Sequence, residues 1–349
     1  MLPSDNHAST LMDRVRDDFE SKPFRPARLL TQADAQTLSA FFWPGRFRPR
    51  DYTGDEKRLF QVETESRVLG RCRWQAKRIE HPTLVLWHGI ESSSSAAYML
   101  STAAKAFRAG FNVVRMNVRN CGDTNHLSPA LYHAGLTDDA RTVIDHLIHD
   151  DGLARIIIAG FSLGGNQVLK LAGEYGDEAP RELIGAVAIS PSVNLQASST
   201  RLEARRNWIY HRSFLDSLKR RIKAKERLYP HLYRTNGLRH IRTIREFDNR
   251  YVAPAFNFAH AEDYYAKASS LPHIKNIRIP TLIIHAQDDP FIPFAPLRDP
   301  SIAANPNVLV IAPERGGHVG FISARPDKDD EDRFWAENRL VDFCRRAAN

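Results

Sequence analysis

The clearest pattern along the chain is a series of short apolar runs between residues 82 and 312. They are TLVLW at 83–87, FNVVRMN at 111–117, RIIIAG at 155–160, IGAVAIS at 184–190, PTLIIHA at 280–286 and NVLVIA at 307–312. Segments of helical length separate these runs. Strands that are apolar on both sides and alternate with helices are typical of a parallel sheet covered on both faces. The pattern therefore predicts an α/β fold.

The rest of the chain departs from this alternation in two places. The first fifty residues predict a loose arm with one helix, which Thr31 would cap and Pro44-Gly45 would end. Two extended runs near 57–63 and 67–75 predict an antiparallel pair of strands. Before the strand at 280–286, about ninety residues pass that include a helical pattern. We expect an arm at 1–50 and a domain at 51–349, with a helical insertion lying over the sheet.

Composition excludes several protein classes. The chain has 349 residues, of which 42% are hydrophobic, and this is too much apolar material for a disordered protein. No apolar run approaches the roughly 20 residues that a bilayer requires, and the N-terminus shows no apolar signal-peptide core. The three cysteines are few and scattered, without a CxxC pair. They favour a reducing, cytoplasmic setting.

Positive charge is concentrated in one segment. The net charge is +8. Residues 201–250 hold fifteen Lys and Arg against five acidic residues, an excess of ten, so the remaining chain carries a net charge of −2. The basic character therefore belongs to the insertion and not to the whole molecule.

The sharpest chemical motif is Gly160-Phe161-Ser162-Leu163-Gly164, which fits G-x-S-x-G. A strand pattern precedes it and a helix pattern follows it, as this motif requires. The tight turn strains the serine, and the flanking glycines let neighbouring backbone approach. Ser162 is therefore predicted to be a nucleophile; the alternative is a glycine-rich turn in which the serine only caps the helix.

A second motif, Trp87-His88-Gly89-Ile90, directly follows the strand at 83–87. A His-Gly pair in this place typically supplies a donor to an oxyanion hole. We expect the backbone N–H groups of Ile90 and Leu163 to form it. His88 precedes the serine in the chain and is predicted to be structural.

Candidates for the acid and the base follow two later strands. Asp288 and Asp289 come just after the strand at 280–286, and His318 lies in the loop after the strand at 307–312. Both positions are at carboxyl ends of strands, where open α/β sheets bind their ligands. The order Ser162, Asp288 or Asp289, His318 agrees with a serine–acid–histidine triad. His285 lies inside a strand and is predicted to be structural.

Other reactive side chains receive a structural interpretation. Cys121 could be a thiol nucleophile, but the sequence implies no basic partner, so we expect a small buried hydrophobic residue. His126, His133, Asp138 and Asp139 lack a recognised ligand spacing. No metal site is predicted, and the expected chemistry needs no cofactor.

The ordered blocks WHGIES, RNCGDTNHLSPALYHAGLTDDA, GFSLGGNQVLKLAGE, IREFDNRY, AEDYYAKAS, LIIHAQDDPFIP and GGHVGF resemble the YheT-type α/β-hydrolases. That bacterial group is similar to mammalian α/β-hydrolase-domain esterases and phospholipases and to plant embryogenesis-associated hydrolases. The resemblance runs from about residue 25 to the C-terminus. It implies a serine esterase or lipase with an α/β-hydrolase fold, a mostly parallel sheet of about eight strands and a helical cap at about 195–270. This chain has Ser92 and Asn120 where the family usually has glycine.

The pattern typical of such hydrolases distinguishes Asp288 from Asp289 as the acid of the triad. Such hydrolases often read G-x-x-D-x-x-V-P after the relevant strand. Ala286, Asp289, Ile292 and Pro293 occupy those places, whereas Asp288 would shift the pattern by one residue. We therefore predict the triad Ser162, Asp289 and His318, with Asp288 accepting hydrogen bonds within the turn.

The sequence thus predicts an enzyme that hydrolyses carboxylic esters, with a small-molecule and possibly lipid substrate. A peripheral membrane contact through the basic cap is compatible with this prediction, and nucleic acid is not expected as a partner. The alternative is a non-catalytic scaffold that binds polyanions through the cap. Lys and Arg runs on helices are usually only solvated, and no nucleic-acid-binding motif accompanies them, so we prefer the enzyme.

Overall fold

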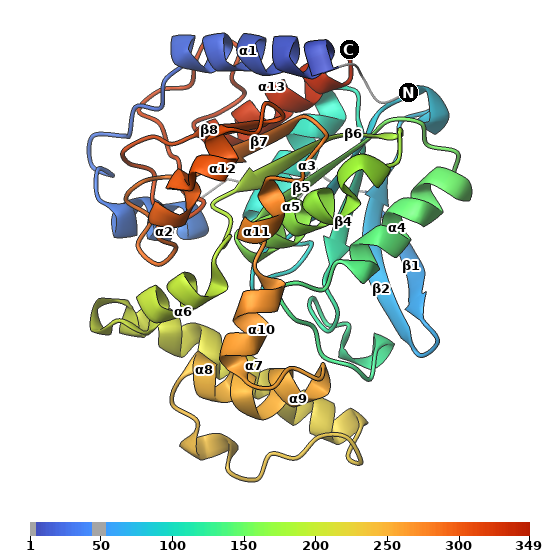
Figure 1. Cartoon of the computed structure of the whole chain (residues 1–349), viewed down its shortest axis with the longest axis vertical. Coiled ribbons are helices and arrows are strands. Elements are labelled where there is room, and N and C mark those ends of the chain that lie inside the picture. Colours follow the sequence, from blue (N-terminus) through green and yellow to red (C-terminus); the bar gives the residue numbers. More distant parts are fainter. Residues whose placement is uncertain (1–4, 44–53) are drawn as a thin grey trace.

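The computed structural model describes residues 5–43 and 54–349, and its centre is one eight-stranded sheet (Figure 1). The strand order is β1-β2-β4-β3-β5-β6-β7-β8. The strands are β1 (Glu56–Glu63), β2 (Ser66–Arg73), β3 (Thr83–Trp87), β4 (Asn112–Asn117), β5 (Ile156–Phe161), β6 (Leu183–Ile189), β7 (Thr281–Ile284) and β8 (Val308–Ile311). Strand β2 pairs antiparallel with β1 and β4, and the other neighbours are parallel. The predicted α/β fold and its antiparallel pair are confirmed.

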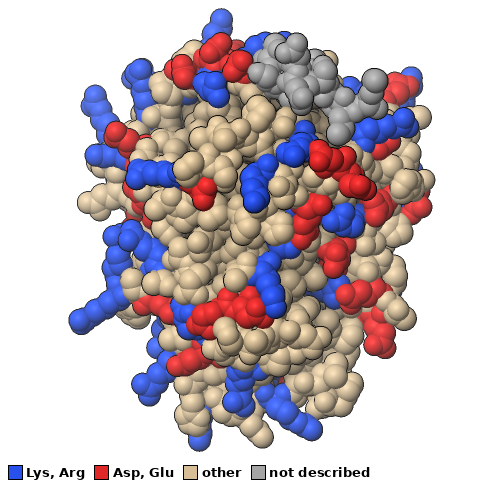
Figure 2. Space-filling view, viewed as in Figure 1, with Lys and Arg blue, Asp and Glu red and all other residues tan. Residues whose placement is uncertain are grey.

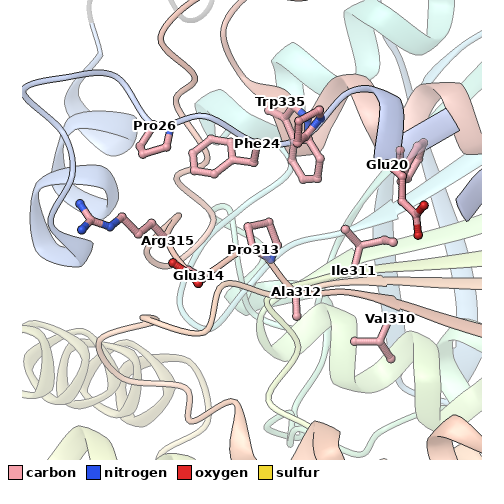
Figure 3. Close-up of a pocket in the computed structure, with 12 residues that line it drawn as sticks. Glu20, Phe24, Pro26, Val310, Ile311, Ala312, Pro313, Glu314, Arg315 and Trp335 are labelled. Atoms are coloured by element: carbon pink, nitrogen blue, oxygen red, sulfur yellow. The ribbon is translucent and has the colours of Figure 1, made fainter. Parts of the chain in front are cut away.

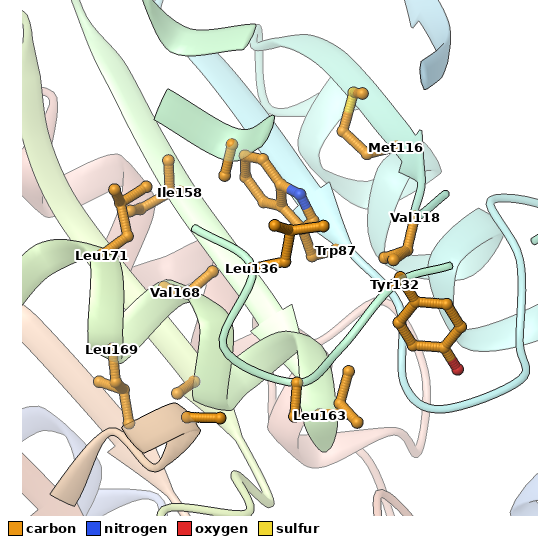
Figure 4. Packing of buried hydrophobic residues seen from close by; sticks show 14 of the residues in the cluster. Trp87, Met116, Val118, Tyr132, Leu136, Ile158, Leu163, Val168, Leu169 and Leu171 are labelled. Carbon is orange, nitrogen blue, oxygen red and sulfur yellow. The ribbon is translucent and has the colours of Figure 1, made fainter. Parts of the chain in front are cut away.

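Helices cover both faces of this sheet, because each strand buries alternate residues on opposite sides. Val85 of β3 belongs to the cluster that packs under α4 (Asp138–His149) and α5 (Leu163–Tyr175). Its neighbours Leu84 and Leu86 belong to the cluster under α1 (Asp5–Ser21), α3 (Ala97–Arg108) and α13 (Trp335–Ala347). Figure 4 shows part of the first cluster, which includes Trp87 at the end of β3 and Leu163 at the start of α5.

The N-terminal arm contains two helices, α1 and α2 (Ala33–Phe42), where the sequence analysis predicted one. Leu11, Val15 and Phe19 recur every four residues and are buried against the sheet, so a periodic signal for α1 was present. Helix α2 is preceded by Gln32, whose side chain makes no capping hydrogen bond. The predicted cap at Thr31 is therefore wrong by one position. The predicted stop at Pro44-Gly45 lies outside the described residues.

The insertion between β6 and β7 forms the cap. It contains α6 (Leu195–Glu203), α7 (Trp208–Leu228), α8 (Ile244–Phe247), a π-helical turn (Asp248–Val252), α9 (Ala253–Ala255) and α10 (Ala261–Ala268). Figure 1 shows these helices grouped at one end of the molecule. Short helices α11 (Leu271–Ile274) and α12 (Pro300–Ala303) complete the fold.

The helical pattern expected within the insertion, RLEARRNWIYHRSFLDSLKRRIKAKERLY at 201–229, is broken in the structure. Helix α6 ends at Glu203, and α7 begins at Trp208 after a single 3-10 turn. The side-chain amide of Asn207 holds this corner by donating to the carbonyl oxygens of Arg201 (2.8 Å) and Pro290 (2.9 Å). Because Pro290 directly follows Asp289, the cap contacts the loop beyond β7 and lies over the carboxyl ends of the strands, not over a face of the sheet.

Candidate active site

Ser162 lies in a tight turn between β5 and α5. Its φ of 54° and ψ of −116° place a non-glycine residue in a strained conformation. The Ser162 N–H donates to the carbonyl of Ile189 on β6 at 2.9 Å, and the Asn166 N–H donates to the Ser162 carbonyl at 3.0 Å. A β-carbon on Gly164 would lie 2.6 Å from the carbonyl oxygen of His88. The glycine therefore lets the loop after β3 pass directly beside the serine.

Asp289 and His318 form a hydrogen-bonded pair at the ends of β7 and β8. The distance from Asp289 Oδ2 to His318 Nδ1 is 2.7 Å. The other oxygen, Oδ1, accepts from the backbone N–H groups of Phe291 (3.1 Å) and Ile292 (2.8 Å). Burial alone would raise the pKa of Asp289, but the neighbouring imidazole of His318 holds it below its ordinary value. Asp289 is therefore a buried carboxylate, and both of its oxygens are hydrogen-bonded.

Asp288 has a different environment. Its Oδ1 accepts the backbone N–H of Gly317 at 2.9 Å, and partial burial raises its pKa above the ordinary value. Asp288 thus fixes the loop that precedes His318, and within the described residues it makes no hydrogen bond to the imidazole.

His318 and Ser162 are attached to the same turn, which follows β6. The Val319 N–H donates to Ser190 Oγ at 3.1 Å, and the Ser192 N–H donates to the Ser162 carbonyl at 3.4 Å. Within the described residues, the structure gives no hydrogen bond between the Ser162 hydroxyl and His318. Hydrogen bonds of this kind are often long in the absence of substrate.

The loop after β3 leaves one backbone donor unused beside Ser162. The Gly89 N–H donates to the Tyr98 hydroxyl (3.0 Å), and the Glu91 N–H donates to the Tyr132 hydroxyl (3.3 Å). The Ser92 N–H donates to the Gly89 carbonyl (3.3 Å). In the described residues, no hydrogen bond uses the Ile90 N–H.

Leu163 is the other residue expected to supply an oxyanion donor. It is the first residue of α5, and the N–H groups of a first helical turn have no partner within the helix. A β-carbon on Gly89 would lie 3.8 Å from Ser162 Oγ. The loop that carries Ile90 therefore lies against the serine from one side, and the start of α5 extends from its other side.

The two departures from the family pattern have local explanations. The Ser92 hydroxyl accepts from Tyr98 at 2.9 Å, so Ser92 extends the bonding chain that begins at the Gly89 N–H. Asn120 has φ of 66°, in the left-handed region that glycine favours and asparagine tolerates best among other residues. Its side chain donates to the carbonyl of Ala130 at 2.8 Å, so both loops keep their form without the glycines.

The two other histidines near the site are buried structural residues. His88 Nε2 accepts the Val118 N–H (3.1 Å), so its Nδ1 carries the proton and donates to the Gly89 carbonyl (2.7 Å). Burial lowers the pKa of His88 to about 4. His285 is buried in the strand-end region and lies 3.2 Å from the Ile292 carbonyl through Nε2, and burial lowers its pKa too.

Cys121 and the possible metal ligands are also used structurally. Burial raises the pKa of the Cys121 thiol to about 11, far from the range of a reactive thiolate. Asp139 accepts a charge-assisted hydrogen bond from Arg119 Nε at 2.6 Å, and His133 packs against the ring of Phe256 with centroids 4.5 Å apart. Within the residues described, no group of three or more His, Cys, Asp or Glu could hold a metal ion.

Helix α2 supports the histidine loop, which the sequence analysis did not predict. The His318 N–H donates to Thr37 Oγ1 at 2.9 Å. Gln36 is fully buried, and its side-chain amide accepts the Ile322 N–H (2.7 Å) and donates to the Leu30 carbonyl (2.7 Å). The bonds to His318 and Ile322 join residues more than 280 positions apart, and no periodic sequence signal reports such a contact.

A small pocket lies between the cap and the predicted oxyanion loop. Its volume is about 50 Å³, and both Ile90 and Leu163 line it. The cap contributes apolar side chains from α7, α8 and the π-helical turn, namely Leu218, Ile244, Phe247 and Val252. An apolar pocket beside these backbone donors suits the acyl part of an ester.

A larger pocket lies elsewhere. Its volume is about 520 Å³, and it opens between the N-terminal segment and β8, where Phe24 and Trp335 face Pro313 (Figure 3). None of the predicted site residues lines it. Size alone therefore does not locate the predicted site, since only the smaller pocket is lined by predicted site residues, namely Ile90 and Leu163.

Comparison with known proteins identifies the family. Residues 84–328 match the model of the alpha/beta hydrolase family. YheT of Escherichia coli (strain K12) is 34% identical over 326 residues, which cover 93% of each chain. Human phospholipase ABHD3 is 30% identical over 69% of this chain and 59% of its own, and the monoacylglycerol lipase of Saccharomyces cerevisiae is 30% identical over 76% and 59%. The chain thus spans about three fifths of the latter two proteins.

Solved structures share the fold at low sequence identity. The Pyrococcus furiosus esterase Pf2001 has a TM-score of 0.56 at 18% identity, covering 88% of this chain and 96% of that chain. A 2,6-dihydroxy-pseudo-oxynicotine hydrolase has a TM-score of 0.54 at 14% identity, covering 89% and 71%. At these identities the similarity concerns the fold alone.

Proposed function

Because the chain belongs to the alpha/beta hydrolase family, we propose that it is a serine hydrolase that cleaves carboxylic esters of acyl or lipid type. The observation that carries this proposal is the Asp289–His318 pair, 2.7 Å apart, on a loop that is fixed to the same turn as Ser162. The names of the phospholipase and lipase relatives support esters of lipids as the substrate class.

In the proposed mechanism, Asp289 orients His318. The carboxylate accepts the Nδ1 proton, which leaves Nε2 free to accept a proton from the Ser162 hydroxyl. The Ser162 oxygen then attacks the ester carbonyl, and a tetrahedral intermediate forms. Because Asp289 stays ionised, it stabilises the imidazolium that appears at this step.

The negative charge of the intermediate requires donors at the carbonyl oxygen. The N–H groups of Ile90 and Leu163 would supply them, together with the positive end of the α5 dipole. His318 then protonates the departing alcohol, and the acyl group remains on Ser162. Water, activated by the same imidazole, hydrolyses this acyl-enzyme and restores the serine.

The polyanion-binding alternative receives less support. Arg221 and Lys225, two of the cap's cations, are buried, and Arg245 pairs with Glu262 at 2.6 Å. Part of the basic character therefore serves the interior of the protein. The remaining exposed Lys and Arg are spread over the cap, at the lower edge of Figure 2, beside acidic side chains.

The decisive experiment compares the wild-type chain with Ser162→Ala on p-nitrophenyl butyrate. Turnover by the wild type that is lost in the variant is expected, because the acyl-enzyme cannot form without the hydroxyl. Ser198→Ala is a matched control, since Ser198 is also a buried serine but lies on α6 of the cap. Equal rates for wild type and Ser162→Ala would refute the proposed function.

A further inference from the structure

A buried ion pair connects the cap to the turn that carries Ile90. Arg221 of α7 donates from Nη2 and Nε to Glu91 Oε1, at 2.7 and 3.0 Å. The two side chains are only 8% and 5% exposed. Charges buried this deeply require their partner, because neither can be solvated alone. Glu91 directly follows Ile90, so the cap is attached beside the predicted oxyanion donor.

Further hydrogen bonds hold both the side chain and the backbone of Glu91. The Ser217 hydroxyl, also on α7, donates to Glu91 Oε2 at 2.8 Å. The Tyr132 hydroxyl donates to Glu91 Oε1 at 3.0 Å and accepts the Glu91 backbone N–H at 3.3 Å. The guanidinium of Arg221 lies 5.0 Å above the Tyr132 ring. One tyrosine and one arginine therefore fix both the side chain and the backbone of Glu91.

The backbone of Glu91 needs such support. Its φ of 53° lies in the left-handed region, which costs on the order of 1 kcal/mol for a non-glycine residue. A strained residue keeps this conformation only where its surroundings hold it. The peptide on its N-terminal side carries the Ile90 carbonyl, and the Ile90 N–H belongs to the peptide before that one. Glu91 therefore fixes the C-terminal side of Ile90, and releasing it would let the turn and the direction of the Ile90 N–H change.

Charge gives a second reason for the pair. A carboxylate one residue from the oxyanion would oppose the negative charge that develops in the intermediate. Arg221 lies against that carboxylate and compensates its charge. Loss of Arg221 would therefore harm the transition state in two ways, through the direction of a donor and through the local field.

We propose that Arg221 and Tyr132 are positioning residues for ester hydrolysis. Through Glu91 they hold the turn that presents the Ile90 N–H, so the cap helix α7 takes part in stabilising the transition state as well as in covering the pocket. This inference rests on the proposed function, since it concerns the same reaction at the same serine.

The test compares Arg221→Gln with Lys225→Gln. Lys225 lies one turn further along α7 and also joins the cap to the core, through the carbonyls of Asn125 (3.1 Å) and Ser128. It makes no bond to Glu91 in the described part of the chain. We expect Arg221→Gln to lower kcat by about 10- to 100-fold with KM changed less than about 3-fold, and Lys225→Gln to keep kcat within about 3-fold.

Inhibitor binding separates positioning from general loosening of the cap. A trifluoromethyl ketone that matches the ester adds to Ser162 and places an oxyanion in the hole, whereas the methyl ketone resembles only the ground state. In Arg221→Gln the inhibition constant of the trifluoromethyl ketone should rise in proportion to the loss in kcat. The inhibition constant of the methyl ketone should stay unchanged.

A milder variant guards against misfolding. Tyr132→Phe keeps the ring and removes both hydroxyl contacts with Glu91, so we expect about a 10-fold loss in kcat with a normal circular dichroism spectrum. The proposal is overturned if Tyr132→Phe has wild-type kcat, or if Arg221→Gln and Lys225→Gln lose activity equally. If activity is lost in Ser162→Ala but is unchanged in Arg221→Gln and Tyr132→Phe, this inference alone is refuted and the proposed function stands.

Discussion

At the scale of single residues, two adjacent carboxylates have been given separate tasks by their surroundings. Asp289 accepts from His318 and from two backbone N–H groups, while Asp288 accepts from Gly317. The opposite directions of their pKa values follow from these partners, since a neighbouring imidazole favours the charged form of Asp289 and burial disfavours that of Asp288. One aspartate thus holds a histidine side chain and the other fixes a loop.

We predict that Asp289→Asn is far more damaging to kcat than Asp288→Asn. Loss of the orienting acid in a serine triad costs on the order of 10⁴ in kcat, because the imidazole adopts the wrong tautomer. Loss of the Asp288 carboxylate removes one hydrogen bond to Gly317 and should cost about 10-fold or less. Steady-state kinetics on p-nitrophenyl butyrate measure kcat, and thermal melts show whether both variants fold. A larger loss of kcat in Asp288→Asn would mean that Asp288, and not Asp289, is the acid of the triad.

The buried carboxyl group of Asp248 should make the stability of the folded protein depend on pH. It is buried in the cap, where burial raises its pKa to about 7, and its Oδ2 accepts the Tyr265 hydroxyl at 2.6 Å. Since the folded-state pKa lies above that of the unfolded chain, the folded state binds the extra proton, and its contribution to stability falls as pH rises from about 4 to about 7. Asp248→Asn, which keeps an oxygen acceptor, should therefore gain melting temperature relative to wild type as pH rises.

The measurement is the difference in melting temperature between Asp248→Asn and wild type from pH 5 to pH 8. Asp216→Asn serves as the control, because Asp216 is partly exposed on α7 and shows no comparable burial. A difference for Asp248→Asn that stays constant across this range would contradict the assignment of a raised pKa.

At the scale of elements, helix α2 acts as a support for the histidine loop. Gln36 bonds to the backbone of Ile322 through both ends of its amide, as donor at 3.1 Å and acceptor at 2.7 Å. Thr37 accepts the His318 N–H. The loop 316–322 also contains Gly317, where φ is 62° and a β-carbon would overlap the carbonyl of Ala33. An arm expected to be loose is therefore packed against the predicted base.

We predict that Gln36→Leu destabilises the protein by about 1–3 kcal/mol, because the buried Ile322 N–H loses its acceptor. Activity should fall by several-fold, since the His318 loop is no longer fixed. Gln32→Leu is the matched control, as Gln32 is exposed at the start of the same helix. Chemical denaturation and kcat report the two effects, and equal stability of the two variants would argue against a supporting role for α2.

At the scale of the whole molecule, the cap both closes the pocket and carries most of the positive excess. The exposed arginines Arg205 and Arg206 precede Asn207, which bonds to the Pro290 carbonyl beside Asp289. They therefore lie on the side of the cap that contacts the loop of Asp289. Arg227 is also exposed but lies at the opposite end of α7, a helix of 21 residues and roughly 30 Å. None of the helices in the described ranges is long and apolar enough to cross a membrane.

We predict that these arginines attract anionic esters to the site. Raising salt from low concentration to about 0.15 M, where the Debye length is about 8 Å, should lower kcat/KM for an anionic ester more than for a matched neutral ester. The double variant Arg205→Gln, Arg206→Gln should reduce this difference, and Arg227→Gln should leave it. Parallel salt curves for the two esters with the wild-type protein would exclude electrostatic attraction.

Much of the fold and the chemistry was determined by the sequence itself. The apolar runs specify strands because burial on both faces permits little else, and the six predicted strands from β3 to β8 are present. The motif around Ser162 specifies part of its own turn, since a β-carbon on Gly160 would overlap the Gly164 carbonyl of the same turn. The ordered motifs identified the family without any contact between distant residues.

Tertiary structure decided which distant residues meet. The contacts of Thr37 with His318 and of Arg221 with Glu91 join segments 281 and 130 positions apart, and a single hydrogen bond leaves no periodic trace in a sequence. The same holds for charge, because Arg221 and Lys225 count toward a basic surface in the sequence but are buried in the fold. Periodicity records which face of an element is buried; only packing determines what each buried group touches.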